Sequence, residues 1–323
     1  MTVPCLLVTT GAPAFGAARI PRALSKSGFE VALLAPRESL PGKSRFVDRV
    51  GHLPDAASGA QWVFAFAAMV KAVAPRIVLP GDDMALHLLE MLVTAPPGGM
   101  QPAMQASLAA LVCASLGDPA HFATTSDPAL VQTVATELGL APAHGNAARA
   151  ADAADGEAPR NIAVQLAAHE GKLLAGWASE TVVAGLQAGA AASVVRRMHH
   201  PAAHAAAAEL VAALGMTGLV TIEFSVDASD QVALVRIDRT VPAGAHVGAK
   251  IGVDLCAALL DALEGRPQST PARLAPEDTG YNVRFPQEWL RDPYSEWLRK
   301  YPVDVPWDEP ELFETFIAMR PTG

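Results

Sequence analysis

The sequence predicts an α/β protein in which an N-terminal doubly wound domain with a parallel sheet precedes a second domain of the α+β class. Over the first hundred residues, apolar strand-like runs alternate with helical segments, which is typical of a parallel sheet. Two later regions, 162–177 and 218–239, each contain two strand-like segments joined by a short polar turn, which is typical of antiparallel hairpins. Half of the residues are apolar (51%) and few are aromatic (6%), which favours a soluble, helix-rich α/β fold.

The N-terminal region predicts a βαβ unit that continues into further strands and helices. Strands are expected at 4–10, 30–34, 46–50 and 76–80, and helices at 17–27, 61–74 and 84–92. The first helix ends at Gly28, a residue type that commonly terminates helices in the left-handed conformation. Asp82 and Asp83 precede the third helix, where acidic side chains serve as caps and need no further function.

Helices and hairpins dominate the rest of the chain. Helices are expected at 102–116, 127–139 (with Ser126 as a cap), 201–214 and 253–264, and strands at 162–167, 172–177 and within 218–239. The stretch 141–160 is rich in Ala, Gly and Asp without periodicity, which predicts a loop. The predicted domains are an N-terminal α/β domain (1–118), a second domain (119–277) and a C-terminal extension rich in Trp and Pro (278–323). We expect the extension to wrap around the body, or to contact a protein partner or a second copy of the chain.

Charge and cysteine content exclude several functional classes. The chain has 33 acidic and 24 basic side chains, and its net charge of -9 argues against binding to nucleic acid or anionic membranes. Its three cysteines, Cys5, Cys113 and Cys256, are far apart in apolar segments, which predicts buried free thiols rather than zinc ligands. The N-terminus lacks the basic lead of a signal peptide, and every apolar run is too short to span a membrane. We therefore expect a cytoplasmic protein.

The hairpin at 218–239 has one polar and one apolar face. If Asp227 pairs with Val232, then Glu223 lies opposite Arg236 and Phe224 lies opposite Val235. Side chains alternate along a strand, so one face carries Glu223, Arg236 and Asp238, and the other carries Ile222, Phe224, Val235 and Ile237. The polar face is consistent with a metal or phosphate site, or with a solvated sheet surface that carries a cross-strand salt bridge.

The order of these elements resembles the ATP-grasp superfamily of ATP-dependent carboxylate–amine and carboxylate–thiol ligases. Residues 79–83 (LPGDD) resemble part of the family's N-terminal domain, and 139–142 (GLAP) resemble its step into the central subdomain. The more specific match is 218–224 (GLVTIEF) followed by 234–239 (LVRIDR), which resemble the two strands that carry the family's metal ligands. Residues 252–255 (GVDL) resemble the end of the next conserved loop. The resemblance implies that the second domain is a shortened ATP-grasp-like domain.

The resemblance also implies a chemistry and a set of site residues. In the family, ATP and magnesium activate a carboxylate as an acyl phosphate, which an amine or thiol then attacks. Glu223 and Asp238 match positions that hold magnesium and the nucleotide, and both are oxygen ligands of the kind magnesium prefers. Arg239 lies one position from an arginine that contacts phosphate or a substrate carboxylate. His246 and Lys250 lie in the loop that borders the acceptor site, so with Arg239 they are the candidate catalytic residues.

Three departures from the family pattern predict an eroded nucleotide and metal site. Arg236 occupies the place of the central metal-bridging glutamate, where a cation repels magnesium and can instead neutralise Glu223. No lysine occurs between Lys71 and Lys172, where the family has its phosphate-contacting lysines. The segment between Pro142 and Ile162 is too short for the usual flap over the phosphates. ATP and magnesium are therefore doubtful cofactors.

Two functions stay open, and a third is disfavoured. The chain is either a divergent ligase that joins a small carboxylate to an amine, or an inactive homologue that serves as a small-molecule-binding or regulatory module. A Rossmann-type dinucleotide enzyme would need a GxGxxG loop and an acid after the second strand, where Ala35 and Pro36 stand. His199 and His200 precede Pro201 at a predicted helix start, where capping or exposure to solvent is expected rather than metal binding.

Overall fold

The computed structural model describes residues 2–11, 14–54, 57–141, 159–186, 190–266 and 272–319. Its N-terminal half contains a four-stranded parallel sheet with the strand order β3-β2-β1-β4. The strands are β1 (Val3–Val8), β2 (Phe29–Pro36), β3 (Arg49–Leu53) and β4 (Ile77–Pro80). The helices of this half are α1 (Phe15–Ser27), α2 (Gly59–Val73), α3 (Asp83–Thr94) and α4 (Pro102–Leu116). The predicted parallel sheet is confirmed.

Helices cover both faces of this sheet. Alternate residues of β1 point to opposite sides, so each side of the strand packs against different helices. Cys5 and Leu7 lie in a core cluster with Leu24 of α1. Leu6 and Val8 lie in a second cluster with α2, α3 and α4. Asp82 caps α3 as predicted, since its side chain accepts a hydrogen bond from the Ala85 amide. The arrangement is doubly wound, in agreement with the predicted fold class.

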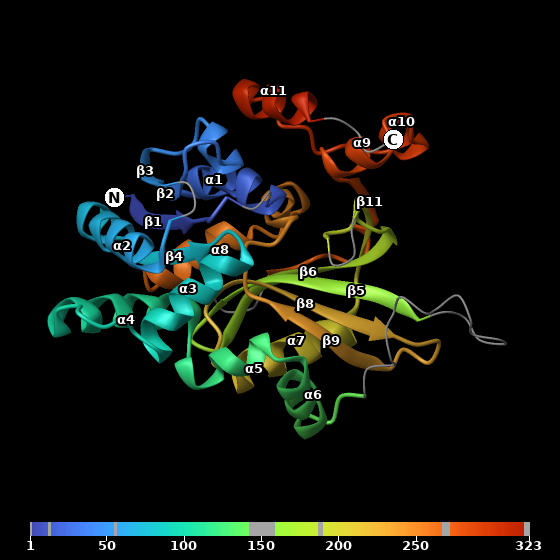
Figure 1. Ribbon diagram of the computed structural model, residues 1–323. Helices are drawn as coiled ribbons and strands as arrows, with labels where there is room; N and C mark the ends of the chain where they lie inside the picture. The colour runs from blue at the N-terminus through green and yellow to red at the C-terminus, as the bar shows by residue number, and fades with distance from the viewer. Residues whose placement is uncertain are drawn as a thin grey trace.

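A larger sheet forms the second half, with the strand order β11-β7-β6-β5-β8-β9 and β10 beside β6 (Figure 1). The strands are β5 (Arg160–His169), β6 (Lys172–Val183), β7 (Val194–Met198), β8 (Gly218–Val226), β9 (Val232–Asp238), β10 (Ala272–Arg273) and β11 (Gly280–Val283). The strands of the main order pair in antiparallel fashion. Both predicted hairpins, β5–β6 and β8–β9, are confirmed.

Different helices lie on the two faces of the larger sheet. Two of them, α6 (Pro128–Glu137) and α7 (Pro201–Ala213), share a core cluster with β5, β8 and β9. On the other face, α8 (Leu255–Leu263) contacts β5 and β6 and also α1 of the first half. Trp177, Leu219 and Leu259 consequently belong to the same core cluster as Cys5 and Leu7. The two sheets therefore share one hydrophobic core through α8.

The C-terminal segment runs from the larger sheet back to the N-terminal half. It adds β11 to the edge strand β7 and continues through α9 (Gln287–Arg291), α10 (Glu296–Lys300) and α11 (Pro310–Ala318). Phe285 and Phe316 pack against Ala18 of α1 and Leu40 of the short 3-10 helix η1 (Leu40–Lys43). This placement agrees with the expectation that the segment wraps around the body (Figure 1).

Several sequence-based expectations differ from the structure in detail. The strand expected at 46–50 lies at Arg49–Leu53. Its bounds were hard to predict because this edge strand is largely exposed and its sequence shows no clear alternation of apolar and polar residues. Asp127 caps α6 in place of Ser126. Neither β7 nor β11 was predicted. Most of the loop expected at 141–160 lies outside the described residues.

Other expectations about single residues are confirmed. The side chain of His200 caps α7, since its Nδ1 accepts a hydrogen bond from the Ala203 amide. All three cysteines are free, with Cys5 and Cys256 buried and Cys113 half-buried.

Within the described part of the chain, no helix is both long and apolar enough to cross a membrane.

Candidate functional site

Glu223 and Arg236 form an ion pair across the β8–β9 ladder. Their Cα positions are paired in the sheet, and Arg236 Nη2 donates to Glu223 Oε1 at 2.7 Å. The predicted pairing of these two residues is therefore confirmed. The predicted pairing of Phe224 with Val235 is wrong, because the register shifts between Glu223 and Phe224, and Phe224 faces Leu234 instead. The shift is a β-bulge, and it leaves Val235 exposed rather than in the core.

Asp238 lies beside this ion pair but is held mainly by its own neighbour along the chain. Its Oδ1 accepts hydrogen bonds from the Thr240 amide at 2.8 Å and from the Thr240 hydroxyl at 2.7 Å. Its Oδ2 lies 3.9 Å from Arg236 Nη2. Burial raises the pKa of Asp238 above its ordinary value, and the bonds from Thr240 oppose this shift only in part. Both predicted metal ligands thus share one sheet face with a guanidinium between them.

This donor set does not fit magnesium. Mg²⁺ requires several oxygen ligands in near-octahedral geometry, and a neighbouring cation opposes its binding. Arg236 occupies the space between Glu223 and Asp238, and it already neutralises Glu223. Among the residues that the structure describes, no group of three or more His, Cys, Asp or Glu side chains could hold a metal ion. The geometry instead resembles a sheet face whose charges are compensated internally.

Arg239 points into the protein and away from this face. It donates to Glu90 Oε1 at 3.0 Å, to Thr125 Oγ1 at 3.1 Å and to the Leu116 carbonyl at 2.9 Å. Its guanidinium lies 4.7 Å from the centre of the Phe122 ring. The side chain is only 3% exposed, so these internal partners surround it. Arg239 therefore joins the end of β9 to α3 and α4, and the structure does not bring it together with Glu223 and Asp238.

His246 lies in the 3-10 helix η4 (Ala245–Ile251) and is bound to Asp304 of the C-terminal segment. Burial, together with the nearby charge of Arg19, lowers the pKa of His246 to about 4. The ring is consequently neutral near pH 7, and its Nε2–H donates to Asp304 Oδ2 at 2.7 Å. Burial alone would raise the pKa of Asp304, but the bond from His246 and the charge of Arg19 hold it at about 2. This pair connects the loop after β9 to the segment after β11.

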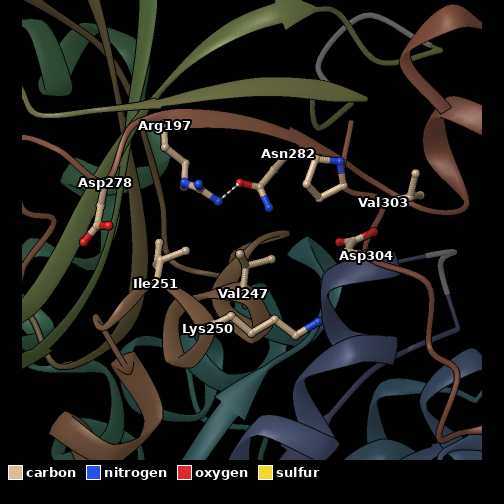
Figure 2. A pocket seen from close by; sticks show the side chains of 9 residues that line it. Arg197, Val247, Lys250, Ile251, Asp278, Asn282, Val303 and Asp304 are labelled. Carbon is tan, nitrogen blue, oxygen red and sulfur yellow. Dashed lines mark hydrogen bonds between the residues drawn. The ribbon is translucent and has the colours of Figure 1, made fainter. Parts of the chain in front are cut away.

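A cavity of about 250 Å³, here called cavity 1, lies on one side of this pair. Its polar lining consists of Arg197, Asn282, Lys250, Asp278 and Asp304. Arg197 Nη1 donates to Asn282 Oδ1 at 2.6 Å, while the buried Arg197 Nε has no hydrogen-bond partner within the described ranges. In Figure 2, Arg197 and Asn282 approach the cavity from one side and Lys250 from the other. Cavity 1 thus combines two cations, an amide and two acids.

A second cavity of about 240 Å³, here called cavity 2, lies between α1, η4 and the C-terminal segment. Its polar lining consists of Arg19, Arg22, His246, Lys250 and Asp308, and Val305 and Trp307 add apolar surface. Lys250 lines both cavities, and cavity 2 contains His246 whereas cavity 1 contains its partner Asp304. Of the three candidate catalytic residues, His246 and Lys250 therefore lie together at these cavities, and Arg239 does not. Whether any of them is catalytic stays a prediction.

Most residues of the cavity lining were not predicted from the sequence as site residues, including Arg19, Arg197, Asn282 and Asp304. These residues come from α1, β7, β11 and the C-terminal segment, and none of them belongs to a recognised motif. One usable signal was present at Arg19, which is a charged residue within the apolar run Ala17, Ala18, Arg19 and Ile20 of the first helix. A cation on the buried stripe of an amphipathic helix needs a special environment.

The fold is similar to that of biotin carboxylase domains, which are ATP-grasp proteins. The chain matches the biotin carboxylase subunit of pyruvate carboxylase with a TM-score of 0.57 and 13% identity, over 87% of this chain and 74% of that one. It matches the biotin carboxylase domain of a single-chain bacterial carboxylase with a TM-score of 0.55 and 18% identity, over 82% and 68% of the two chains.

A third similar structure carries ligands. It is the biotin carboxylase domain dimer of 2-oxoglutarate carboxylase from Hydrogenobacter thermophilus, in complex with MgADP, ADP and bicarbonate. The TM-score is 0.56 with 12% identity, over 87% of this chain and 74% of that one. At such identities the likeness concerns the fold alone, and the predicted ATP-grasp fold is confirmed. No protein-family model and no curated protein matches the sequence.

Proposed function

We propose that this chain, which has the ATP-grasp fold of biotin carboxylase domains, binds a small carboxylate without magnesium-dependent acyl-phosphate chemistry. The observation that carries the proposal is the ion pair of Glu223 with Arg236, which occupies the face where the fold's metal ligands are expected. The burial of Arg239 against Glu90 supports it further, because this guanidinium is not available to a phosphate. The protein would then act as a binding or regulatory module.

Cavity 1 has the chemistry that such a ligand needs. Arg197 and Lys250 supply positive charge on opposite sides, and a guanidinium can bind a carboxylate through two parallel hydrogen bonds. Asp278 and Asp304 line the same cavity. A ligand that carries an amine as well as a carboxylate would therefore have an oppositely charged side chain near each of its two groups. The volume of about 250 Å³ is at the lower end for ligand cavities, which favours a small metabolite.

Calorimetric titration tests both parts of this proposal. We expect no magnesium-dependent binding of ATP, and we expect binding of a small carboxylate in the absence of nucleotide. Suitable probes are bicarbonate, which the Hydrogenobacter thermophilus domain binds, and glycine, which carries both a carboxylate and an amine. Arg197→Met should weaken the binding of the carboxylate, while Arg196→Met is a control, because Arg196 pairs with Glu180 outside the cavity lining. ATP binding that requires magnesium would contradict the proposal.

A divergent ligase is the second candidate function. It is favoured by the position of Glu223 and Asp238 on one face of β8–β9, in a fold whose solved neighbours include a complex with MgADP. A ligase that works through an acyl phosphate would release ADP from MgATP when a carboxylate and an amine are both present. Release above the background of an Arg197→Met variant would favour the ligase over the binding module. A contact of the C-terminal segment with a protein partner or a second copy stays a prediction, as does the cytoplasmic location.

A further inference from the structure

Arg19 is a buried cation that forms no ion pair with any described residue, although the carboxylates of Asp304 and Glu309 lie near it. It lies on α1 between Ala18 and Ile20, and only 5% of its surface is exposed. Its Nε and Nη1 atoms are buried and have no hydrogen-bond partner among the residues that the structure describes. An unpaired buried polar group lowers stability, and a charged one does so more strongly. Arg19 nevertheless lines cavity 2, so its guanidinium borders a space that a ligand can enter.

The acids around Arg19 are already bound to other groups. Asp308 accepts from Arg22 Nε at 2.6 Å, and Asp304 accepts from His246 and from the Phe285 amide. Glu309 accepts from Ser44 through Oε1, while its buried Oε2 has no partner in the described part of the chain. A direct contact between Arg19 and Glu309 is therefore the competing arrangement. Burial raises the pKa of Glu309, which makes its carboxyl group a poorer counter-charge.

A second cation reaches the same cavity. Lys250 lines cavity 2 together with Arg19, and its exposed side chain forms no ion pair with any residue that the structure describes. Trp307 also lines the cavity and is 75% exposed, so its indole provides an apolar wall in contact with solvent. The cavity thus has a buried guanidinium, an amine that is open to solvent and an aromatic wall.

We propose that cavity 2 is a binding site for a compact oxyanion, a carboxylate or a phosphate group, which supplies the missing partner of Arg19. Guanidinium groups bind both oxyanions through charge-assisted hydrogen bonds, and the amine of Lys250 adds a second positive charge. This site goes beyond the proposed carboxylate site, because it uses Arg19 of α1 whereas cavity 1 uses Arg197 of β7. Of the residues that the structure describes, Lys250 alone lines both.

Titration of the full chain with inorganic phosphate and, separately, with acetate tests the site. The wild-type protein should bind at least one of the two ions, and the stronger ligand identifies the oxyanion. Arg19→Met keeps an unbranched apolar stem but removes the guanidinium and its charge, so it should weaken binding by roughly tenfold or more.

Two further variants test whether the oxyanion binds at Arg19 and whether Glu309 competes with it. Arg160→Met is the control. Arg160 pairs with Asp230 at 2.6 Å and does not line cavity 2, so its loss should leave binding of the oxyanion unchanged. Glu309→Gln removes the competing carboxylate and should leave binding intact or strengthen it.

Three outcomes would overturn the proposal: the wild type binds neither ion, Arg19→Met binds as well as the wild type, or Glu309→Gln abolishes binding. A lower oligomeric state of Arg19→Met in light scattering would also overturn it, because a carboxylate of a second copy would then be the partner. Loss of glycine binding in Arg197→Met without loss of the phosphate or acetate signal would show that the two cavities act separately.

Discussion

The carboxylate of Glu223 accepts a hydrogen bond of 2.7 Å from the guanidinium of Arg236, its neighbour across the β8–β9 ladder. In the function that we propose, this ion pair takes the place of an acid-to-metal contact. Both side chains are more than a third exposed, so the pair adds little to stability, on the order of 1 kcal/mol or less. Its main consequence is electrostatic, because it removes the negative potential that would attract a divalent cation.

Replacing Arg236 by an acid should create affinity for magnesium. In Arg236→Glu the sheet face would carry three carboxylates, with Glu223 and Asp238 as the other two, and their repulsion would be relieved by a cation. We expect titration calorimetry to detect Mg²⁺ binding that the wild type lacks. The matched variant Arg236→Gln removes the guanidinium without adding a carboxylate and should gain much less. Equal Mg²⁺ affinity in the wild type and in Arg236→Glu would show that Arg236 does not block the site.

Arg239 should be important for stability rather than for binding ATP. In Arg239→Met the buried Glu90, the Thr125 hydroxyl and the Leu116 carbonyl would lose their donor. Loss of one partner of a buried ion pair costs about 3–5 kcal/mol, which denaturant unfolding can measure. The double variant Arg239→Met with Glu90→Leu should recover part of this loss, because no buried charge is left unpaired. A stable Arg239→Met protein with altered nucleotide binding would favour the family role instead.

Protonation of two buried histidines should lower the free energy of unfolding as the pH falls from about 6.5 to 4. The pKa of His246 is lowered to about 4 in the folded protein and returns to about 6.5 on unfolding, so the unfolded chain binds more protons in this window. Burial also lowers the pKa of His204 to about 4, and this residue contributes in the same window. Each shift corresponds to at most about 3 kcal/mol.

Asp304 adds a separate step at lower pH. Its pKa is about 2 in the folded protein against an ordinary value of 3.8, so its contribution is complete above 3.8 and is lost as the pH falls toward 2. Denaturant unfolding at several pH values would measure both steps. His246→Gln and His204→Gln should each reduce the slope between pH 6.5 and 4, whatever their effect at pH 8. An unchanged slope in both variants would contradict the assignment.

Gly280 should matter for cavity 1 through its lack of a side chain. Its φ is +155°, and an added Cβ would lie 3.0 Å from Arg197 Nη2. In Gly280→Ala the guanidinium of Arg197 would have to move, so we expect binding of glycine or bicarbonate to weaken severalfold, as calorimetry would show. Gly265→Ala is a matched control, since Gly265 also has a positive φ (+68°) but no described residue within 4 Å of the added Cβ. A similar loss of binding in both variants would point to backbone strain alone.

The sequence predicted the polar hairpin well because alternation along a strand places Glu223, Arg236 and Asp238 on one face. It did not predict the bulge at Val235, since one extra residue leaves the apolar pattern intact on both sides of it. The proposed role of Arg239 came from its position next to Asp238 in the chain. Consecutive side chains of an extended segment point to opposite sides, which is why Arg239 meets Glu90 instead.

The cavities could not be predicted from the sequence, for a different reason. Arg22 and Asp308, which lie together at cavity 2, are 286 positions apart in the chain. Such a contact depends on how β11 and α11 return to the N-terminal half, and the sequence from 278 onward carries no motif that specifies this path. By contrast, the parallel sheet and both hairpins depend on local periodicity, and these were predicted correctly.

The shared core around α8 limits how the protein can move. Leu259 of α8 lies in one cluster with Leu7 of the first sheet and Trp177 of the second, so rotating the sheets apart would expose this apolar surface to water. Gly16 adds to the restriction, because even one added carbon there would lie 2.7 Å from the Val241 carbonyl. Hinge bending between the two sheets is thereby disfavoured, and the described body is expected to melt in one cooperative transition. A ligand would accordingly be recognised by a largely preformed surface rather than by closure of one half onto the other.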